Sequence, residues 1–331
     1  GVRLQTDVHV SILPNTEVVI NDSNGMKIKE IGAINELEKN EIKVPAFDPL
    51  DLKIKWHNAK VIKHPYKGKI FDITTKSGRS VSITSGHSLF KLEKGRIVTE
   101  TGDSLRIGDF LAIPKRFSWH SEIDEIDIRD YIKIEGSNYS MNSEMLFYNK
   151  IPISKLRIKM NNEFARLLGY YLAEGSAPRH ISLVIGKHEE DLLKDIESSI
   201  KKSFPSNIHV VDRGSSYEIS FGANTLKKLF KSWFGDNAKN KRIPKFIFSS
   251  NREFKLNFLG AYINGDGTID KGKEHFRIRI KTASKKLASD LLYLFSQLGI
   301  CAKFDHIEIN KKRQIAGNKA LTEETSSYVI R

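Results

Sequence analysis

The hydrophobic pattern of this 331-residue chain changes in character along its length. From about residue 11 to residue 116, short β-branched runs alternate with turn residues, which predicts strands rather than helices. The hairpin turns are expected at Asp22–Gly25 and Lys76–Arg79, because glycine accepts a positive φ. One helix is expected at Ile28–Glu38. The expected strands are Thr16–Ile20, Lys60–Lys63, Ile70–Thr75, Ser80–Thr84 and Phe110–Pro114.

Beyond residue 161 the apolar residues recur at helical spacing, between short strand-like runs. The order of elements then begins again near residue 253, which indicates an internal duplication. The strand at Ser326–Ile330 corresponds to Ser216–Phe221, and we expect the second repeat to lack its last helix because the sequence given ends at Arg331. The elements expected in the first repeat are 162–174, 181–185, 189–203, 207–211, 216–221 and 223–234.

Residues 118–160 separate these two parts and differ from both. They hold a cluster of five acids followed by the polar stretch Gly136–Asn142. We interpret the segment as a connector whose acids are solvated rather than catalytic. The acids are Glu122, Asp124, Glu125, Asp127 and Asp130.

Two segments of the duplicated part, Leu167–Gly175 and Phe258–Gly267, end alike. An offset of 92 positions places Gly169 on Ala261 and Ala173 on Gly265, so each segment carries small residues four apart on one helix face. Small residues at that spacing let two helix backbones approach closely. The alternative interpretation is a pair of ordinary buried helices with glycine caps and surface acids.

Each of these helices delivers one carboxylate, Glu174 or Asp266, in its last turn. A negative charge there faces the negative end of the helix dipole, which costs about 0.3–1 kcal/mol unless a cation compensates. The symmetrical repetition therefore predicts a shared divalent metal site. Mg²⁺ suits two carboxylates, because it takes hard oxygen ligands and keeps several waters.

The net charge of +14 is concentrated in the second half of the chain. Residues 151–331 hold 32 Lys and Arg against 19 Asp and Glu, whereas residues 1–150 hold 22 against 21. This asymmetry indicates a nucleic-acid-binding part, because phosphate contacts supply much of such affinity; a solvated basic face is the alternative. Neither a long apolar run nor a signal pattern occurs, so we expect a cytoplasmic protein without membrane association. The single cysteine, Cys301, lies in an apolar run and is expected to be a buried thiol.

Taken together, the helix pair resembles the LAGLIDADG homing endonucleases. The resemblance implies an α+β domain of two αββαββα-like repeats, about 161–250 and 251–331, whose helix ends meet over the scissile phosphates. It implies a monomer that cuts a long asymmetric double-stranded DNA site with Mg²⁺ bound by Glu174 and Asp266. Lys241 matches the family's lysine near the metal-bound water, and Lys281 is a substitute for its counterpart in the second repeat.

DNA reading would then fall to the antiparallel strands, whose outward residues enter the major groove. Most such residues contact phosphates and carry no base information. The candidates are Arg213, Arg277, Arg279, Lys281, Lys311, Lys312 and Arg313.

Three local patterns in the first part resemble the Hint splicing domain of inteins: Ser11–Val18, Thr84–His87 and Leu105–Pro114. The resemblance implies that Ser11 attacks the preceding carbonyl and converts an amide to an ester. A neutral hydroxyl is a poor nucleophile, so the site must polarise the amide and protonate its departing nitrogen. His87 is placed for this by the resemblance, with Thr84 as its hydrogen-bonding neighbour. The alternative makes Ser11 a strand-entry residue and His87 a satisfied half-buried histidine.

On this interpretation Gly1–Val10 is host (extein) sequence that is still attached, and Ser11 is either native or a replacement of Cys. Inteins finish with a strand block and a His-Asn pair, and that block is absent from these 331 residues. We therefore expect the chain to perform the first acyl shift or N-terminal cleavage, without a cofactor.

The sequence thus predicts a multidomain protein: an intein precursor of archaeal type, with an all-β Hint domain over residues 11–117 and an embedded endonuclease over residues 161–331. The main alternative is a non-cleaving LAGLIDADG nucleic-acid binder, maturase-like or regulatory, with an inactive Hint scaffold. A third is a splicing element whose nuclease has decayed. Retention of both Glu174 and Asp266 favours cleavage, because a pure binder has no need for acids that face phosphates.

Overall fold

The structure, a computed structural model, describes residues 11–22, 25–34, 42–116, 122–271, 276–315 and 319–331. The chain divides into two compact units. Unit 1 comprises residues 1–118 with 299–301, and unit 2 comprises residues 119–298 with 302–331. Within the described part, no helix is both long enough and apolar enough to cross a membrane.

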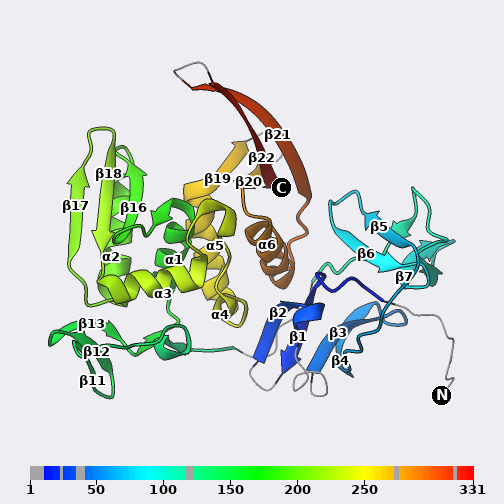
Figure 1. Cartoon of the computed structure of the whole chain (residues 1–331), viewed down its shortest axis with the longest axis horizontal. Coiled ribbons are helices and arrows are strands. Elements are labelled where there is room, and N and C mark those ends of the chain that lie inside the picture. Colours follow the sequence, from blue (N-terminus) through cyan, green and yellow to red (C-terminus); the bar gives the residue numbers. More distant parts are fainter. Residues whose placement is uncertain (1–10, 23–24, 35–41, 117–121, 272–275, 316–318) are drawn as a thin grey trace. The chain divides into compact units, whose positions relative to one another are not determined.

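Unit 1 is built from strands, as the short β-branched runs predict (Figure 1). Its first sheet has the order β2-β1-β3-β4, a second pairs β5 with β6, and a third has the order β8-β7-β9. A small core of Ile20, Ile34 and Ile42 packs under the first sheet. The strands are β1 (Glu17–Asp22), β2 (Gly25–Glu30), β3 (Ile42–Asp48), β4 (Lys53–Ala59), β5 (Ile70–Thr74), β6 (Ser80–Thr84), β7 (Ser88–Glu93), β8 (Arg96–Thr101) and β9 (Phe110–Leu111).

Two predictions in unit 1 are wrong. The helix expected at Ile28–Glu38 is instead strand β2 followed by the 3-10 helix η1 (Ile31–Ala33), and residues 35–41 lie outside the described part. The pairing of β1 with β2 decides this conformation, because it satisfies the backbone groups that a helix would satisfy internally. The strand expected at Lys60–Lys63 is irregular chain that follows β4.

The hairpin predictions are confirmed where the structure describes them. Asp22 pairs with Gly25 across the first turn, although Ser23 and Asn24 themselves lie outside the described residues. In the second turn Gly78 has φ 83°, the left-handed conformation that favours glycine. Strand β6 has the bounds expected from the sequence, and β9 covers only the first two residues of the expected Phe110–Pro114.

Residues 122–160 are not a plain connector; they belong to unit 2 and form strands of their own. Strand β10 (Glu125–Asp127) pairs with β14 (Arg157–Lys159), and the 3-10 helix η3 (Ile128–Asp130) directly follows β10. The acids of this segment are solvated or paired, yet the apolar residues between them are buried: Ile126, Ile128, Leu146, Ile153, Leu156 and Ile158. A further sheet has the order β11-β12-β13, with strands β11 (Tyr139–Met141), β12 (Met145–Tyr148) and β13 (Ile151–Lys155).

The remainder of unit 2 holds two runs of elements in corresponding order. The two sheets also correspond, with orders β15-β16-β18-β17 and β19-β20-β22-β21. The first run is α1 (Asn162–Glu174), β15 (Gly175–Ser176), β16 (Ile181–Gly186), α2 (Glu190–Ser203), β17 (Ile208–Asp212), β18 (Ser216–Phe221) and α3 (Asn224–Phe234). After η4 (Ala238–Asn240) and α4 (Lys245–Phe248), the second run is α5 (Arg252–Asp266), β19 (Gly267–Lys271), β20 (Phe276–Thr282), α6 (Lys285–Leu298), β21 (Phe304–Ile315) and β22 (Lys319–Ile330).

Helices α1 and α5 lie side by side and pack at very short range (Figure 1). A Cβ added to Gly169 would lie 2.3 Å from the Phe258 carbonyl oxygen and 2.7 Å from the Ala261 Cβ. A Cβ added to Gly265 would lie 2.5 Å from the Ala173 Cβ. The predicted close approach at small residues is therefore confirmed, and the glycines permit it because they present no side chain.

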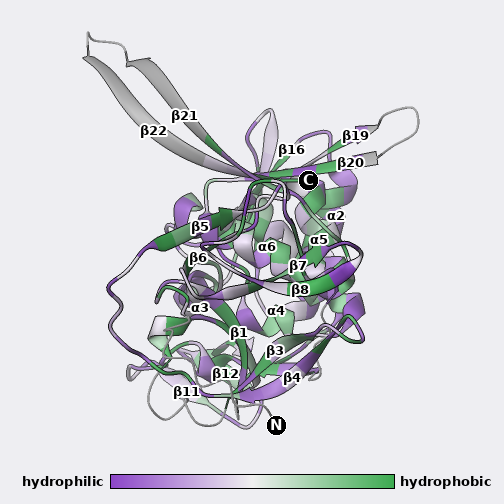
Figure 2. Cartoon of the chain, turned by 90° about the vertical axis from the view of Figure 1, so that its right-hand side faces the viewer, coloured by the Kyte–Doolittle hydropathy of each residue, from purple (hydrophilic) through white to green (hydrophobic). Residues whose placement is uncertain are grey.

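Both helices begin in the same way. The side chain of Asn161 accepts from the Phe164 N–H at 2.8 Å, and Asn251 does the same for Phe254. Phe164 and Phe254 are fully buried and contact one another edge-on, so the caps also fix the two aromatic rings beneath the helix starts. Helices α5 and α6 carry hydrophobic stretches (Figure 2), and both contribute buried residues to the core of unit 2, among them Phe258 and Leu291.

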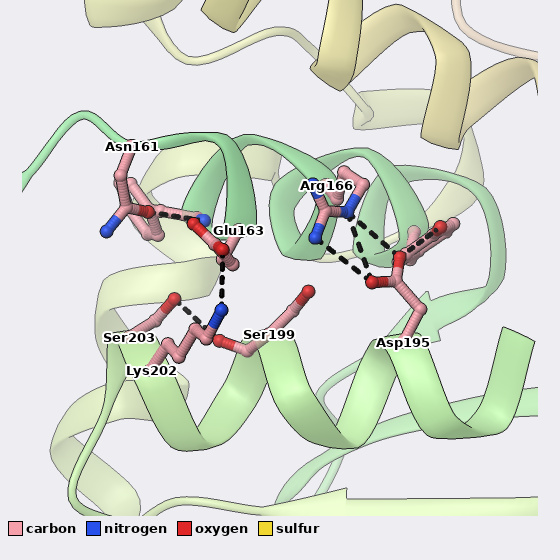
Figure 3. Close-up of polar contacts among 9 residues, drawn as sticks. Asn161, Glu163, Arg166, Asp195, Ser199, Lys202 and Ser203 are labelled. Carbon is pink, nitrogen blue, oxygen red and sulfur yellow. Dashed lines mark hydrogen bonds and ion pairs between the residues drawn. The ribbon is translucent and has the colours of Figure 1, made fainter.

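Polar contacts tie α1 to α2 along their exposed side (Figure 3). Arg166 and Asp195 form a two-pronged ion pair with distances of 2.9–3.2 Å, and the Tyr170 hydroxyl donates to the same carboxylate at 2.7 Å. Nearer the helix start, Lys202 pairs with Glu163 at 2.7 Å. These contacts hold α2 in register against the helix whose far end carries Glu174.

Cys301 is exposed, which contradicts the expectation of a buried thiol. Gly299, with φ 80°, follows the last residue of helix α6. Ala302 is the buried residue of this stretch, whereas Ile300 and Cys301 face solvent.

Candidate functional site

The adjoining ends of α1 and α5 bring two carboxylates close together. Glu174 is the last residue of α1 and Asp266 the last residue of α5, and each is followed by a glycine that passes directly into a strand. Gly175 and Gly267 have φ of −84° and −85°, so these caps are extended and not left-handed. A Cβ on Gly265 would lie 3.5 Å from the Glu174 Oε1, which places that carboxylate beside the last turn of α5.

Lys241 lies at the end of α1. It follows η4, and its Nζ donates to the Leu172 carbonyl at 2.6 Å and to the Ala173 carbonyl at 3.1 Å. These are orphan carbonyls of the last turn of α1, so the ammonium compensates the negative end of the helix dipole. Its backbone is fixed in turn, because the Ser284 hydroxyl donates to the Lys241 carbonyl at 2.6 Å.

The three charges perturb one another. Partial burial raises the pKa of Glu174 most, the negative charge of Asp266 raises it further, and Lys241 lowers it. The packed helix ends also withdraw water from the Asp266 carboxyl and raise its pKa, although the residue as a whole is exposed, and Lys241 again opposes the shift. Burial lowers the pKa of Lys241, and both carboxylates counteract it. Two partly desolvated carboxyl groups at adjoining helix ends form an arrangement that a bound cation would stabilise.

The donor set fits a hard divalent cation that keeps most of its waters. Two carboxylates converge, and no group of three or more metal-ligating side chains occurs in the part of the chain that the structure describes. A cation held by only two carboxylates completes its coordination with water and with oxygen atoms of a substrate such as phosphate, as Mg²⁺ does. The predicted pair therefore fits the expected metal better than it fits zinc, which prefers nitrogen and sulfur ligands.

The candidate DNA-contacting residues fall into three groups. Arg213, after strand β17, is held by Glu218 at 2.6 Å, and Arg279 on β20 is held by Asp270 on β19 at 2.8 Å. Arg277 and Lys281 are exposed on β20, on the same face as Arg279, as predicted from their spacing of two. Lys311, Lys312 and Arg313 belong to strand β21, and their side chains lie outside the described part.

In unit 1, Ser11 is held against the end of strand β6. Its N–H donates to the Thr84 Oγ1 at 2.9 Å, and the Thr84 N–H donates back to the Ser11 carbonyl at 3.0 Å. The antiparallel bridge between Ile12 and Ile83 continues this pairing along β6. Thr84 is almost fully buried, so both bonds are shielded from water. These two hydrogen bonds hold the backbone of Ser11, including its amide nitrogen, against Thr84.

His87 is joined to this site through the backbone. Its N–H donates to the Thr84 carbonyl at 3.1 Å, and its own carbonyl accepts from Gly102 at 2.9 Å. Burial lowers the pKa of the His87 ring, and its Nδ1 is buried without a hydrogen-bond partner among the described residues. The structure thus brings Ser11 and Thr84 into contact and joins His87 to Thr84 through the backbone.

One contact of Ser11 is absent from the sequence-based expectations. The Ser11 Oγ lies 2.7 Å from the Nε2 of His64, in the irregular segment between β4 and β5. Tyr66 anchors this segment, because its hydroxyl lies 3.1 Å from the Ser85 Oγ. No spacing or motif links His64 to Ser11, so only the folded path of residues 60–69 reveals the contact.

Known proteins match most of this chain. A family model described as the intein splicing domain matches residues 18–316, a stretch that includes Thr84 and His87 and begins after Ser11. The chain is 26% identical over 396 residues to a DNA polymerase of Thermococcus kodakarensis, with 85% of this chain and 23% of the polymerase covered. It is 29% identical over 262 residues to the DNA-directed RNA polymerase subunit Rpo1C of Methanocaldococcus jannaschii, with 76% and 29% covered. The chain therefore spans less than a third of the length of these archaeal relatives.

Similar solved structures include an intein from a hyperthermophile and the homing endonuclease I-DmoI. The intein is 17% identical, with 30% of this chain and 70% of that chain covered at a TM-score of 0.26. The endonuclease is 17% identical, with 52% and 88% covered at a TM-score of 0.34. The match of the family model over residues 18–316 shows that the chain belongs to the intein splicing domain family.

Proposed function

We propose that unit 1 carries out the first step of protein splicing at Ser11 and that unit 2 is a divalent-metal-dependent, site-specific double-strand DNA endonuclease. In this proposal Gly1–Val10 is host sequence that the acyl shift separates from the intein. We propose further that the endonuclease acts as a monomer in the cytoplasm, because one chain supplies both carboxylates of the site.

The proposed splicing step rests on one observation, the fixed amide of Ser11. The Ser11 hydroxyl attacks the Val10 carbonyl carbon, a C–O bond forms, and the C–N bond to Ser11 breaks to leave a free amine. Holding the amide N–H on Thr84 at 2.9 Å orients the scissile bond toward the hydroxyl of the same residue. Thr84 and His87 assist this step, and no cofactor is required.

Hydroxylamine tests this step, because it cleaves esters far faster than amides. We expect the full chain to lose the peptide Gly1–Val10 as its hydroxamate, measured by intact mass, and Ser11→Ala to remain whole. Thr84→Ala should slow release about 10-fold, since one hydrogen bond near a buried site contributes about 1.5 kcal/mol. Equal release from Ser11→Ala would show that the ester does not form at this residue.

The proposed nuclease rests on the meeting of Glu174, Asp266 and Lys241 at the ends of two closely packed helices. A divalent cation, for which we propose Mg²⁺, would be held by the two carboxylates; when bound it lowers the pKa of water and neutralises charge on the phosphate. Lys241 places a positive charge beside the same helix ends. The exposed basic residues of β20 would contact the DNA backbone.

The nuclease is tested with a library of randomised DNA duplexes and Mg²⁺, with the cleaved ends sequenced. We expect cleavage at one defined sequence by the unaltered chain. Glu174→Gln and Asp266→Asn should each lower cleavage by at least about 10²-fold while DNA binding persists. Asp191→Asn is the matched control, because its carboxylate on α2 is fully exposed and should leave cleavage unchanged.

The same experiment separates the alternative function. Sequence-specific binding without cleavage by the unaltered chain, in Mg²⁺ or Mn²⁺, would identify unit 2 as a nucleic-acid-binding module. Cleavage that survives both Glu174→Gln and Asp266→Asn would refute the metal-site assignment.

A further inference from the structure

We propose that His64 is the catalytic base that takes the proton of the Ser11 hydroxyl during the acyl shift; the inference rests on the splicing step proposed above. The Nε2 of His64 lies 2.7 Å from the Ser11 Oγ, which is within direct proton-transfer reach. Both residues are partly buried, which limits the access of water to this hydrogen bond.

The surroundings of the ring select the tautomer that this role needs. The other ring nitrogen, Nδ1, faces the Pro65 carbonyl oxygen at 3.4 Å. A carbonyl only accepts hydrogen bonds, so the proton of the neutral ring belongs on Nδ1. Nε2 is then left with its lone pair toward Ser11, and the serine hydroxyl is the donor of the 2.7 Å bond.

A base is needed because a serine hydroxyl is a weak nucleophile at neutral pH. The other two residues of the site do not supply one. Thr84 is occupied as the acceptor of the Ser11 N–H. The His87 ring makes no hydrogen bond with the Ser11 hydroxyl in the described part of the chain, so it is not placed to take the hydroxyl proton.

The proposed step balances without any further reactant. The hydroxyl proton moves to the His64 Nε2 as the bond between Ser11 Oγ and the Val10 carbonyl carbon forms. The C–N bond then breaks, and the imidazolium returns this proton to the departing Ser11 nitrogen, which becomes an amine. His64 ends as it began, and the rearrangement neither consumes nor releases a proton. A histidine that serves first as base and then as acid toward a leaving amine is a known arrangement in serine hydrolases.

The inference is tested in two nucleophile backgrounds with the hydroxylamine assay on the full chain. In the unaltered background, His64→Ala and His64→Gln should each slow peptide release by about 10²-fold or more. In a Ser11→Cys background the same changes should slow release less than about 10-fold, because a thiol forms its anion near neutral pH without a strong base. Added imidazole should restore part of the rate of His64→Ala.

Glutamine separates catalysis from positioning, because it keeps a hydrogen-bonding group near Ser11 and cannot take the proton. His57→Ala is the matched control: this histidine is exposed on β4 in the same unit and should leave the rate unchanged. Equal thermal melting of the His64 variants and the parent establishes that unit 1 is folded.

Two results would overturn the assignment of His64. One is release from His64→Gln at the parent rate, and the other is an equal loss in the serine and cysteine backgrounds, both of which identify a positioning role. No release from either parent background would instead refute the proposed splicing step itself, and the role of His64 with it.

Discussion

The contact between α1 and α5 makes a prediction of opposite sign for two glycines. Gly169→Ala places a methyl group 2.3 Å from the Phe258 carbonyl oxygen and 3.0 Å from the Tyr262 nitrogen, and neither backbone atom can rotate away. Gly260→Ala, on the exposed side of α5, meets nothing within 4 Å. The same substitution in the same pair of helices is therefore blocked at one position and free at the other.

The magnitudes follow from two terms. Replacing a helical glycine by alanine stabilises a helix by about 1 kcal/mol, through backbone entropy. Overpacking costs about 1–3 kcal/mol, and contacts with backbone atoms place Gly169→Ala at the upper end. We expect a loss of about 2 kcal/mol in the free energy of unfolding for Gly169→Ala and a gain of about 1 kcal/mol for Gly260→Ala.

The assay must report on unit 2 alone, because a chain of two units need not unfold in one transition. Hydrogen exchange with mass spectrometry, over a series of urea concentrations, gives the free energy of opening for peptides of α1 and α5 separately from unit 1. Gly169→Ala should lower protection in both helices together, since each supports the other.

An unchanged or increased opening free energy for Gly169→Ala would refute the close approach of these helices. Loss of protection in α1 alone would also contradict it, because the added methyl group presses on α5. A higher opening free energy for Gly260→Ala alone would show only that glycine lowers helix stability. The two variants, Gly169→Ala and Gly260→Ala, must therefore be compared.

Three further predictions concern charge. The raised pKa of Glu174 means that the native state binds this proton more tightly than the unfolded chain does, so ionised Glu174 lowers stability at pH 7. Glu174→Gln should therefore raise the thermal midpoint at pH 7. This gain should disappear as the pH falls through the ordinary carboxyl range, where the native carboxyl group is protonated. Asp195→Ala removes the acceptor of Tyr170 and should cost about 1–2 kcal/mol by urea unfolding, less than a buried charged bond because the pair is partly exposed. Glu218→Gln frees Arg213 for phosphate and should steepen the salt dependence of DNA binding by about one ion; an unchanged slope would place Arg213 away from DNA.

The helix pair could be predicted because its signals are local. Asparagine caps, an apolar face, small residues four apart and a terminal acid lie within about four turns of helix, and their repetition at a fixed offset marks them as related. The observed bounds of α1 agree with the predicted 162–174, and α2 and α3 begin one residue later than predicted. The roles of the acids remain predictions, because geometry places the charges and does not measure cleavage.

Errors arose where a local preference competed with a distant partner. Residues 28–38 favour a helix by composition, yet β1 supplies a strand partner that satisfies the backbone. The acids of residues 122–130 suggested a solvated connector, but the apolar residues among them, such as Ile126 and Ile128, are buried in unit 2. Charge describes one face of such a segment, and burial of the other face is decided by what it packs against.

The sequence by itself predicted a nucleophile position at Ser11, the Thr84–His87 motif and the two terminal carboxylates, because each is a short pattern whose chemistry depends on residue type and spacing. Only the tertiary structure decided that Lys241 meets the carbonyls at the end of α1 and that His64 meets Ser11. These contacts join residues 69 and 53 positions apart. Pairs so distant along the chain are set by how sheets and helices pack, which no local pattern records.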